Sequence, residues 1–340
     1  MFSKVFLLAS LMCVNAASST VLGTLQTRFR DWVTRHEIHF INNARELRAF
    51  ENWVENDRHI DMVNAKNMTY TLGHNQFSGM DITEFALYLG LDATAGARTV
   101  NLRGPALYLN EIKVASSVDW VDSGAVTPVK NQGQCGSCWS FSTTGALEGA
   151  YFVKYGTLKS FSEQQLVSCD NRQHGGKDMG CNGGLMDNAF TWIKNNGGLC
   201  SESDYPYTSG TTTSAGTCET TCVNVANSMI HSFADVPVKS DDDMMAALNV
   251  QPVSIAIEAD QKDFQLYKSG VFTGDCGTSL DHGVLVVGYG NKDGEDYYRV
   301  KNSWGTTWGD AGYIYLGRGK QYNNGSGQCG MLLQASYPIM

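Results

Sequence analysis

The sequence lacks any apolar run long enough to cross a bilayer. A membrane-spanning helix needs about 20 consecutive apolar residues, whereas the first apolar run of this 340-residue chain extends only from Val5 to Val14. This run follows Lys4 and ends in the small-residue site Val14-Asn15-Ala16, a pattern typical of a cleavable secretory signal. We therefore predict a signal peptide over residues 1–16 and a chain that enters the secretory pathway without a membrane anchor.

A basic surplus is also absent. The formal net charge is −9, and all of this negative excess falls in residues 114–340 because basic and acidic residues balance over residues 1–113. Proteins that bind nucleic acids concentrate Lys and Arg in one stripe or on one face. The sequence shows no such stripe, so we expect no nucleic-acid partner.

The sequence further lacks a complete zinc or redox motif, although it contains ten cysteines. Cys135 and Cys138 have Cys-x-x-Cys spacing, which fits a redox pair or half of a structural zinc site. A redox pair needs a thioredoxin-like βαβ context, and zinc needs another pair of ligands at metal spacing. Neither is visible, so we expect no metal and no cofactor. The cysteine content itself agrees with an oxidising compartment.

Residues from about Gln26 to Met68 are rich in charge and predict helices. Their larger apolar residues fall mainly on three- and four-residue spacings, as on one face of an α-helix; these are Leu47, Phe50, Trp53, Ile60 and Val63. Asp81 begins a further, short helix. The stretch from about Asp92 to Pro105 has little apolar pattern and predicts a linker.

From Val118 onward the chain becomes rich in Gly, Cys, Tyr and Trp. Periodicity and capping residues predict helices in the first half, over Cys138–Tyr155, Ser162–Ser168 and Leu185–Asn195. Short apolar runs predict strands in the second half, over Val253–Glu258, Gly283–Gly288, Tyr297–Lys301 and Tyr313–Leu316. Helices followed by strands indicate an α+β protein of two subdomains with a cleft between them.

Cys138 is the candidate nucleophile. It begins the helix predicted up to Tyr155, where free backbone N–H groups and the helix dipole favour an anion. Such a position lowers the pKa of a thiol. The residues around it, Cys135-Gly136-Ser137-Cys138-Trp139, match a signature known from catalytic cysteines.

A thiolate of this kind needs a nearby base, and the base needs a third group to orient it. His282 stands just before the apolar run Val284–Val287, within the separation of about 130–150 residues from the cysteine that such pairs show. A single His is more often a structural residue, so this separation decides the assignment. Asn302, farther downstream, is expected to accept a hydrogen bond from His282 Nδ1. Trp304 and Trp308 either shield that bond from water or pack in the core.

Gln132 precedes the nucleophile by six residues. A glutamine in a loop usually faces solvent. Here its side-chain N–H can point, together with the backbone N–H of Cys138, at the oxyanion that forms during acyl transfer.

The sequence resembles the papain family of cysteine proteases, and specifically the cathepsin L-type endopeptidases. The resemblance rests on four blocks in the family's order: Gln132–Phe141, Gly180–Met186, Asp281–Val284 and Asn302–Gly305. It implies a papain-like α+β fold with a helical subdomain, a β-barrel-like subdomain and an active-site cleft between them, preceded by a helical propeptide. The expected domains are the signal peptide (1–16), an inhibitory propeptide (17–113) and the peptidase domain (114–340).

The resemblance also implies an activity. We expect a cysteine-type endopeptidase that is made as an inactive precursor and hydrolyses peptide bonds in proteins through a thioester on Cys138. The expected partners are protein and peptide substrates, the chain's own propeptide and cystatin-type inhibitors. The expected state is a monomer located in a lysosome or vacuole or outside the cell. A non-catalytic papain-like protein is the alternative, against which the four intact catalytic residues speak.

An extended substrate is expected to pair with the backbone of Gly183 and Gly184, which have no side chains to obstruct it; a simple glycine turn is the alternative. The resemblance places a pocket for the second residue before the cut, selective for bulky apolar side chains and with a minor acceptance of Arg. Its residues are Leu185, Met186, Ala256, Leu280 and Gly283, with Gln334 at the floor; Asp281 and Trp304 complete the expected substrate-binding set.

The family pattern pairs Cys135 with Cys181 and Cys276 with Cys329. Cys169 would then pair with Cys218 and Cys200 with Cys222, although sequence alone does not fix the pairing among these four. Asn67 and Asn324 stand in glycosylation sequons. No adjacent histidine pair occurs between Arg172 and Asp178, so nothing resembles the blocking loop of a carboxydipeptidase.

The propeptide departs from the family pattern at several positions. Trp53, Asn56, Ile60 and Asn64 fit the second half of the family's helical motif, but Arg45 and Ala49 stand where Glu and Arg are expected. Gly73, Asn75 and Phe77 fit a second motif, in which Gly79 replaces an expected Asp. These departures call the usual salt bridges of the propeptide into question, and with them its pH trigger.

Overall fold

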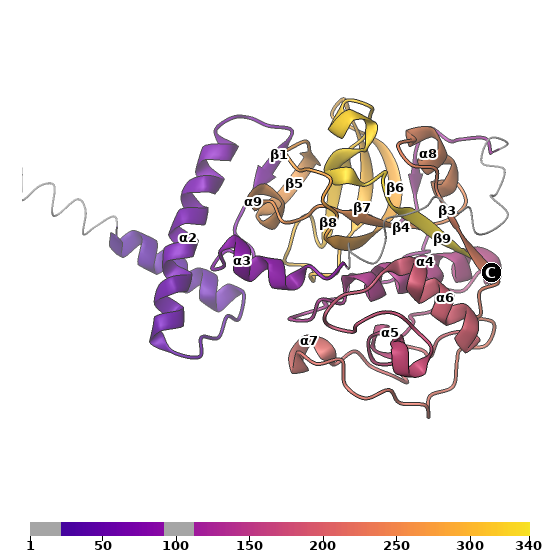
Figure 1. Cartoon of the computed structure of the whole chain (residues 1–340). Helices are drawn as coiled ribbons and strands as arrows, with labels where there is room; N and C mark the ends of the chain where they lie inside the picture. The colour runs from indigo at the N-terminus through magenta and orange to yellow at the C-terminus, as the bar shows by residue number, and fades with distance from the viewer. Residues whose placement is uncertain (1–21, 92–111) are drawn as a thin grey trace, which may run out of the picture.

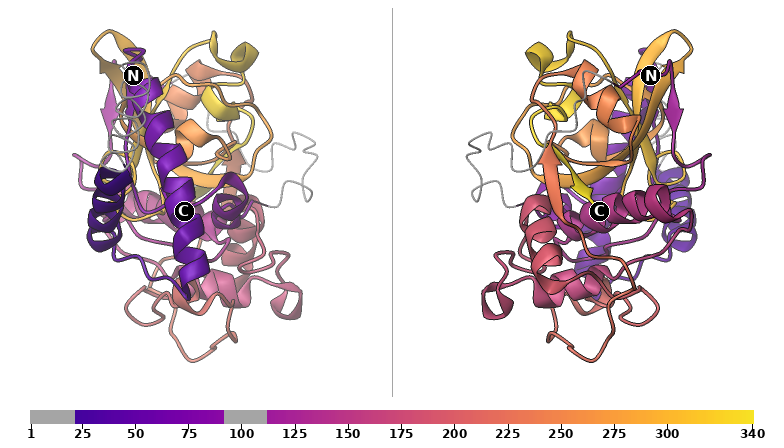
Figure 2. Two further views of the ribbon diagram at one scale, coloured as in Figure 1. Left: turned by 90° about the vertical axis from the view of Figure 1, so that its left-hand side faces the viewer. Right: turned by 90° about the vertical axis from the view of Figure 1, so that its right-hand side faces the viewer.

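The computed structural model describes residues 22–91 and 112–340 (Figure 1). The predicted signal peptide and the predicted linker both lie outside the described residues. The prosegment, residues 22–91, contains a helix over 22–35, α2 (Asn43–Asn64), β1 (Tyr70–Leu72), α3 (Ile82–Phe85) and the 3-10 turn η1 (Ala86–Tyr88). Figure 2 shows its helices together on one side of the molecule. No helix in the two described ranges has the length and apolar character to span a membrane.

The two long prosegment helices cross through a small aromatic core. Phe29 and Trp32 of the first helix pack on Ala49 and Trp53 of α2, and all four are buried. Asn42 precedes helix α2 and caps it, because its side chain accepts a hydrogen bond from the Arg45 backbone N–H. Asn64 ends it by exchanging two hydrogen bonds with the backbone of Leu72, which begins the return of the chain toward α3.

The departures from the family's propeptide pattern are mutually consistent in the structure. Ala49 and Gly79, at the positions where Arg and Asp are expected, meet beside Trp32, and a Cβ on Gly79 would lie 2.8 Å from the Trp32 ring. A carboxylate therefore has no room there. A different ion pair replaces the missing one: Arg28 binds both carboxylate oxygens of Asp57, at 2.9 and 2.5 Å, and His74 Nε2 lies 3.0 Å from the same carboxylate.

The helical subdomain is built around α4 (Cys138–Tyr155), which is buried over most of its length. Small residues allow this close packing: a Cβ on Gly145 would lie 2.8 Å from Leu285, and one on Gly149 would lie 2.5 Å from Pro252. The helix begins and ends where the sequence predicts, and Gly156 closes it in a left-handed conformation. The other helical elements of this subdomain are α5 (Glu163–Cys169), η4 (Arg172–His174), α6 (Met186–Asn196) and α7 (Ser209–Thr212).

The second subdomain is a curved sheet in the order β1-β5-β8-β7-β6-β4-β9-β3, with β2 paired to β6. Its pairs are antiparallel except for β5 with β8. The prosegment contributes β1, which extends the sheet along β5. The strands of this subdomain are β2 (Val118–Asp119), β3 (Ser232–Asp235), β4 (Val253–Ile257), β5 (Tyr267–Phe272), β6 (His282–Lys292), β7 (Glu295–Lys301), β8 (Tyr313–Gly317) and β9 (Ala335–Ile339); its helical elements are α8 (Asp241–Leu248), α9 (Lys262–Gln265), η5 (Tyr322–Gly325) and η6 (Gln328–Gly330).

The sequence locates the predicted helices and strands to within a few residues, and the largest difference is in β6. This strand continues to Lys292, four residues beyond the predicted Gly288, because it forms a hairpin with β7. Four disulfides join Cys135 to Cys181, Cys169 to Cys218, Cys200 to Cys222 and Cys276 to Cys329. The first and the last are the pairs that the resemblance implies, and the other two settle the pairing that the sequence left open. Cys138 is the free cysteine among the described residues.

A buried carboxyl pair fixes the loop between α5 and α6. Asp170 and Asp178 are both buried, and each has one carboxylate oxygen, Oδ2, that finds no hydrogen-bond partner among the described residues. Asp178 Oδ1 accepts from the Leu185 N–H at 3.0 Å and from Asn188 Nδ2 at 2.9 Å, which holds the turn at the start of α6. Burial, and then the neighbouring Asp170 carboxylate, raise the pKa of Asp178. Because two adjacent carboxylates cannot both ionise in a buried site, the pair shares a proton.

This pair predicts a pH dependence of stability. Its folded-state pKa lies above the unfolded value, so its contribution is complete at acid pH and is lost as the pH rises through neutrality. In an inactive Cys138→Ser background, we expect Asp178→Asn to flatten the decline in the free energy of unfolding between about pH 5 and about pH 9 by on the order of 1–3 kcal/mol. The asparagine amide reproduces the shared proton without titrating. Denaturant unfolding at several pH values measures the effect.

The control is Asp204→Asn, at an exposed carboxylate of the same subdomain. It should leave the pH profile of stability unchanged. An equal decline in wild type and Asp178→Asn would contradict the shared proton.

Candidate active site

The start of α4 and the start of β6 bring Cys138 and His282 together. Cys138 is the first residue of α4, and its sulfur accepts a hydrogen bond from the Gly283 backbone N–H at 3.3 Å. His282 is the first residue of β6. The approach is close because position 283 has no side chain: a Cβ there would lie 3.3 Å from the backbone of Trp139. Residues 145 positions apart in the chain thus share one site.

Asn302 orients the His282 ring. His282 Nε2 lies 2.8 Å from Asn302 Oδ1, which also accepts the Ser303 backbone N–H at 2.8 Å. Since Oδ1 is the acceptor in both, Nε2 carries the proton. The sequence-based assignment of this bond to Nδ1 is therefore wrong. Nδ1 is buried without a hydrogen-bond partner among the described residues and is the nitrogen left to exchange a proton with the thiol.

Trp304 covers the His282–Asn302 pair. Its ring stacks on the His282 ring with centroids 4.5 Å apart, and it is 1% exposed. It also belongs to the core of the sheet subdomain, where it contacts Trp308 and two prosegment rings, Phe77 and Phe85. The two interpretations of this tryptophan, shielding and packing, therefore both hold.

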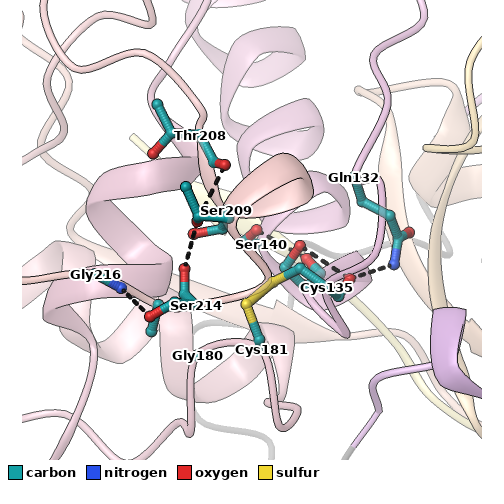
Figure 3. Close-up of a disulfide and its surroundings, with 12 residues drawn as sticks. Gln132, Cys135, Ser140, Gly180, Cys181, Thr208, Ser209, Ser214 and Gly216 are labelled. Atoms are coloured by element: carbon teal, nitrogen blue, oxygen red, sulfur yellow. Dashed lines mark hydrogen bonds between the residues drawn. A yellow bond between two sulfur atoms is a disulfide. The ribbon is translucent and has the colours of Figure 1, made fainter. Parts of the chain in front are cut away.

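Both ends of the Gln132 side-chain amide form hydrogen bonds, which fix its orientation. Its Oε1 accepts from Ser303 Oγ at 2.7 Å, so its Nε2 must supply the donors. One N–H reaches the Cys135 carbonyl at 3.0 Å, next to the Cys135–Cys181 disulfide (Figure 3). The other reaches the carbonyl of Tyr88 in the prosegment at 2.9 Å. The Tyr88 carbonyl of the prosegment therefore accepts a hydrogen bond from the same Gln132 N–H group that is expected to bind the oxyanion.

The prosegment continues through the cleft in an extended form. The Gly90 carbonyl accepts from the Gly184 N–H at 3.2 Å, and the Leu91 N–H donates to the Asp281 carbonyl at 3.0 Å. Gly184 precedes α6 and Asp281 precedes β6, so one contact comes from each subdomain. Position 90 must be glycine for this path, because a Cβ there would lie 2.1 Å from the Gly136 carbonyl oxygen.

Burial keeps both catalytic groups neutral in this form. Burial raises the pKa of the Cys138 thiol to about 11, although N–H groups of Gly283, Gly90 and Trp139 act in the opposite direction. Burial also lowers the pKa of His282 to about 4, against the hydrogen bond to Asn302. The lowered thiol pKa expected from the helix position is therefore not found in this covered form, because desolvation outweighs the helix terminus.

Two of the expected specificity residues, Ala256 and Met186, lie against Gly283. Ala256 pairs with Gly283 in the sheet, and its N–H donates to the Gln334 carbonyl at 2.9 Å. Met186 lies against Gly283, with its sulfur 3.1 Å from the position of a Cβ there. Met186 and Ala256 are fully buried, and Leu185, Leu280 and Gln334 are buried or partly buried near them. Gly183, with φ of 110°, turns the chain before Gly184.

Asp281 has a structural contact in addition to its carbonyl. Its carboxylate accepts the Ala259 N–H at 2.8 Å, which ties the residue before His282 to the end of β4. Burial raises the pKa of this carboxyl to about 7.

Sequence reasoning did not identify a cluster of buried charges behind Asn302. Lys130 Nζ binds Glu148 at 3.1 Å and Glu163 at 2.6 Å, and Lys301 Nζ donates to Thr127 at 3.0 Å. The four charged side chains border a cavity of about 20 Å³, which is close to the size of one water molecule. Burial lowers the pKa of Lys301 to about 8. No spacing in the sequence marks these residues, because they come from four separate segments.

Comparison with known proteins agrees with this site. A model of the papain family cysteine proteases matches residues 114–339. The chain belongs to the papain family of cysteine proteases. A model of the cathepsin propeptide inhibitor domain (I29) matches residues 29–85, so the chain has the prosegment and catalytic domain of a papain-family zymogen.

Relatives and solved structures of papain-family enzymes cover both parts of the chain. The KDEL-tailed cysteine endopeptidase CEP2 of Arabidopsis thaliana is 42% identical over 93% of this chain and 86% of that protein. The probable cysteine protease RD21B of Arabidopsis thaliana is 43% identical over 92% of this chain, which spans only 66% of the RD21B length. The recombinant stem bromelain precursor has a TM-score of 0.82 at 38% identity, covering 93% of this chain and 99% of that one. Digestive procathepsin L 3 of Tenebrio molitor larval midgut has a TM-score of 0.81 at 36% identity, with coverage of 93% and 99%.

The close fit at Gly90 predicts how latency can be removed. In the full-length precursor, Gly90→Ala should expel the segment Tyr88–Leu91 from the cleft, because the added methyl group overlaps the Gly136 carbonyl. The thiol and imidazole then lose their burial. We expect labelling of Cys138 by a fluorescent thiol-reactive epoxide at neutral pH to accelerate about tenfold or more, measured before any processing of the precursor.

Gly23→Ala is the matched control, since a Cβ at this prosegment position meets nothing within 4 Å. It should be labelled at the wild-type rate. A folded Gly90→Ala precursor that is labelled as slowly as wild type would show that this segment does not cause latency.

Proposed function

We propose that this chain is the precursor of a cysteine endopeptidase that cleaves extended protein segments through a thioester on Cys138. One observation supports this above the others: the side-chain N–H of Gln132 holds the carbonyl of Tyr88 at 2.9 Å, while Gly184 and Asp281 pair with Gly90 and Leu91 farther along the prosegment. The site therefore already binds an extended backbone with a carbonyl directed at the oxyanion donor.

The proposed reaction uses the four residues in defined roles. After the prosegment leaves, Cys138 gives its proton to His282 Nδ1, and the thiolate attacks the substrate carbonyl carbon. The resulting oxyanion accepts hydrogen bonds from Gln132 Nε2–H and the Cys138 N–H. His282 then donates the proton to the leaving amine as the C–N bond breaks. Water, deprotonated by His282, hydrolyses the thioester and restores the thiol.

Removal of the prosegment supplies the activation step. Exposure of the cleft reduces the desolvation that raises the pKa of Cys138 and lowers that of His282, so the thiolate–imidazolium pair becomes favourable. We place the boundary between propeptide and peptidase domain at Lys113 and Val114, which agrees with the start of the family match at residue 114. Residues 1–16 are proposed as the signal peptide.

We propose a preference for bulky apolar side chains at the second residue before the cut. Leu185, Met186 and Ala256 offer apolar walls, and burying such a side chain contributes about 1.5–3 kcal/mol. Gln334 stands at the floor of this pocket with 8% of its surface exposed. Its amide oxygen can accept a hydrogen bond from a long cationic side chain, which supports a minor acceptance of Arg.

The remaining proposals concern the cell. A secreted-pathway route to a lysosome, a vacuole or the exterior suits four disulfides. Asn67 and Asn324 are both exposed and are proposed glycosylation sites. The mature enzyme is proposed to be a monomer inhibited by cystatin-type proteins, which would use the cleft that the prosegment fills.

Cleavage of a peptide library by the acid-activated chain tests the proposed activity. We expect cuts within peptides, and their loss, by more than about a thousandfold, in Cys138→Ala. A redox function would instead depend on Cys135 as well as Cys138 and would leave the library intact. No cleavage by a processed, folded wild-type protein would exclude the endopeptidase.

The proposed specificity is tested with fluorogenic dipeptide substrates that differ at the second residue before the cut. For wild type we expect kcat/KM in the order Leu or Phe above Arg. Gln334→Leu should lower kcat/KM for the Arg substrate about tenfold, since a hydrogen bond to a charged group contributes about 1.5–3 kcal/mol. The same variant should change the Leu substrate less than about threefold. Strict rejection of Arg by wild type would count against the role of Gln334.

A further inference from the structure

Tyr207 ties together the two ends of the loop that carries the oxyanion donors. This oxyanion loop, residues 132–138, begins with Gln132 and ends with Cys138. The Tyr207 hydroxyl lies 2.8 Å from the Gln132 carbonyl and 2.7 Å from Ser137 Oγ. A carbonyl can only accept, so the Tyr207 proton goes to Gln132, and Ser137 must donate its own proton to the Tyr207 oxygen. The direction of both bonds is thereby fixed.

Tyr207 is itself held firmly, by groups outside the oxyanion loop. Its backbone N–H donates to Glu202 Oε1 at 2.8 Å, and its ring meets Phe141 of α4 edge-on with centroids 4.9 Å apart. The next two N–H groups, of Thr208 and Ser209, both donate to Gln164 of α5. Farther along, the Gly210 carbonyl accepts the Gln134 N–H at 3.0 Å. The segment around Tyr207, part of which Figure 3 shows beside the Cys135–Cys181 disulfide, therefore forms a fixed support for the oxyanion loop.

The geometry points to Tyr207 as a positioning residue of the oxyanion hole. Its hydroxyl fixes the separation of Gln132 from Ser137, and so directs the Gln132 side-chain N–H and the Cys138 backbone N–H at a single point. This inference rests on the proposed endopeptidase function. Within the described ranges, the hydrogen bonds and the ring contact of Tyr207 go to Gln132, Ser137, Glu202 and Phe141 and not to the prosegment segment Tyr88–Leu91. We therefore infer that it acts on the reaction through the two donors.

The phenol suits this role at every pH at which the enzyme works. Burial, with the Glu163, Glu202 and Cys138 charges nearby, raises the pKa of Tyr207 well above its ordinary value, against the hydrogen bond to Ser137. It therefore remains a neutral donor. Other groups also hold the loop, namely the Ser303 carbonyl, which accepts the Gln132 N–H at 2.8 Å, and the Cys135–Cys181 disulfide. Loss of the hydroxyl should consequently misalign the donors without unfolding the loop.

The test compares Tyr207→Phe with Tyr205→Phe in the full-length chain after activation. Tyr205 is the matched control because its hydroxyl also makes two hydrogen bonds, to the Thr217 carbonyl and from the Glu219 N–H, each at 3.1 Å and away from the oxyanion loop. For Tyr207→Phe we expect kcat to fall about 10- to 50-fold with KM within twofold, since the oxyanion exists only after attack. Tyr205→Phe should stay within twofold of wild type.

Two further readouts separate positioning from general damage. A peptide aldehyde forms a tetrahedral adduct with an oxyanion, so its inhibition by Tyr207→Phe should weaken by about the factor lost in kcat. Alkylation of Cys138 by iodoacetamide forms no oxyanion, so its rate and pH profile should match wild type. Ser137→Ala removes the other bond of the clamp and should lower kcat by a smaller factor, and Ser137→Ala/Tyr207→Phe should be no worse than Tyr207→Phe alone.

The inference is overturned if kcat of Tyr207→Phe is unchanged, if alkylation falls in parallel with kcat, or if Tyr205→Phe loses as much. Should Tyr207→Phe fail to fold, an unchanged kcat and aldehyde affinity in Ser137→Ala would overturn it instead. Absence of peptide cleavage by wild type is a different result, which refutes the proposed function and this inference with it.

Discussion

The contact between the first turn of α4 and the first residues of β6 is the constraint on which the site depends. Gly283 lies against the backbone of Trp139 and donates to the Cys138 sulfur. One turn later, Ser142 donates to the Val284 carbonyl at 2.7 Å and accepts from Ser254 at 2.8 Å through its own carbonyl. These buried hydrogen bonds join a helix of one subdomain to a sheet of the other. A nucleophile on one and a base on the other can therefore act as a pair.

The close packing around Cys138 and His282 also makes the precursor inactive while the prosegment fills the cleft. A thiolate and an imidazolium are stable next to each other only if some solvent or dipole supports their charges, and the prosegment removes solvent from both. The chain tolerates charges elsewhere in this region when they are paired, as Lys130 is with Glu148 and Glu163. In the part of the chain that the structure describes, Cys138 and His282 form hydrogen bonds with neutral groups but have no further, oppositely charged partner. Inhibition thus needs no distortion of the catalytic residues, because covering them is sufficient.

Much of the fold and the candidate site follows from local sequence signals. The limits of α4 come from the small residues on its faces and from Gly156, and the positions of Cys138, His282, Asn302 and Gln132 come from short motifs. What the sequence could not predict depends on contacts between distant segments. The strand β5 contains Lys268, Ser269 and Gly270 and has no apolar alternation, so only pairing with β1 and β8 makes it a strand. The choice between Nδ1 and Nε2 of His282, and the displacement of the thiol pKa, likewise depend on what packs around the motif.

The strand β1 has a consequence for the mature molecule. Tyr70–Leu72 is the edge strand of the sheet and pairs with β5. When the prosegment is removed, β5 therefore loses these backbone hydrogen-bond partners. An edge strand with unpaired backbone groups can pair with a strand of another molecule, which leads to aggregation. Lys268 in β5 has an exposed, positively charged side chain, and this charge opposes such self-association. The prosegment therefore supplies backbone hydrogen-bond partners for β5 in the precursor. After its removal, the charge of Lys268 is what opposes strand addition at this edge.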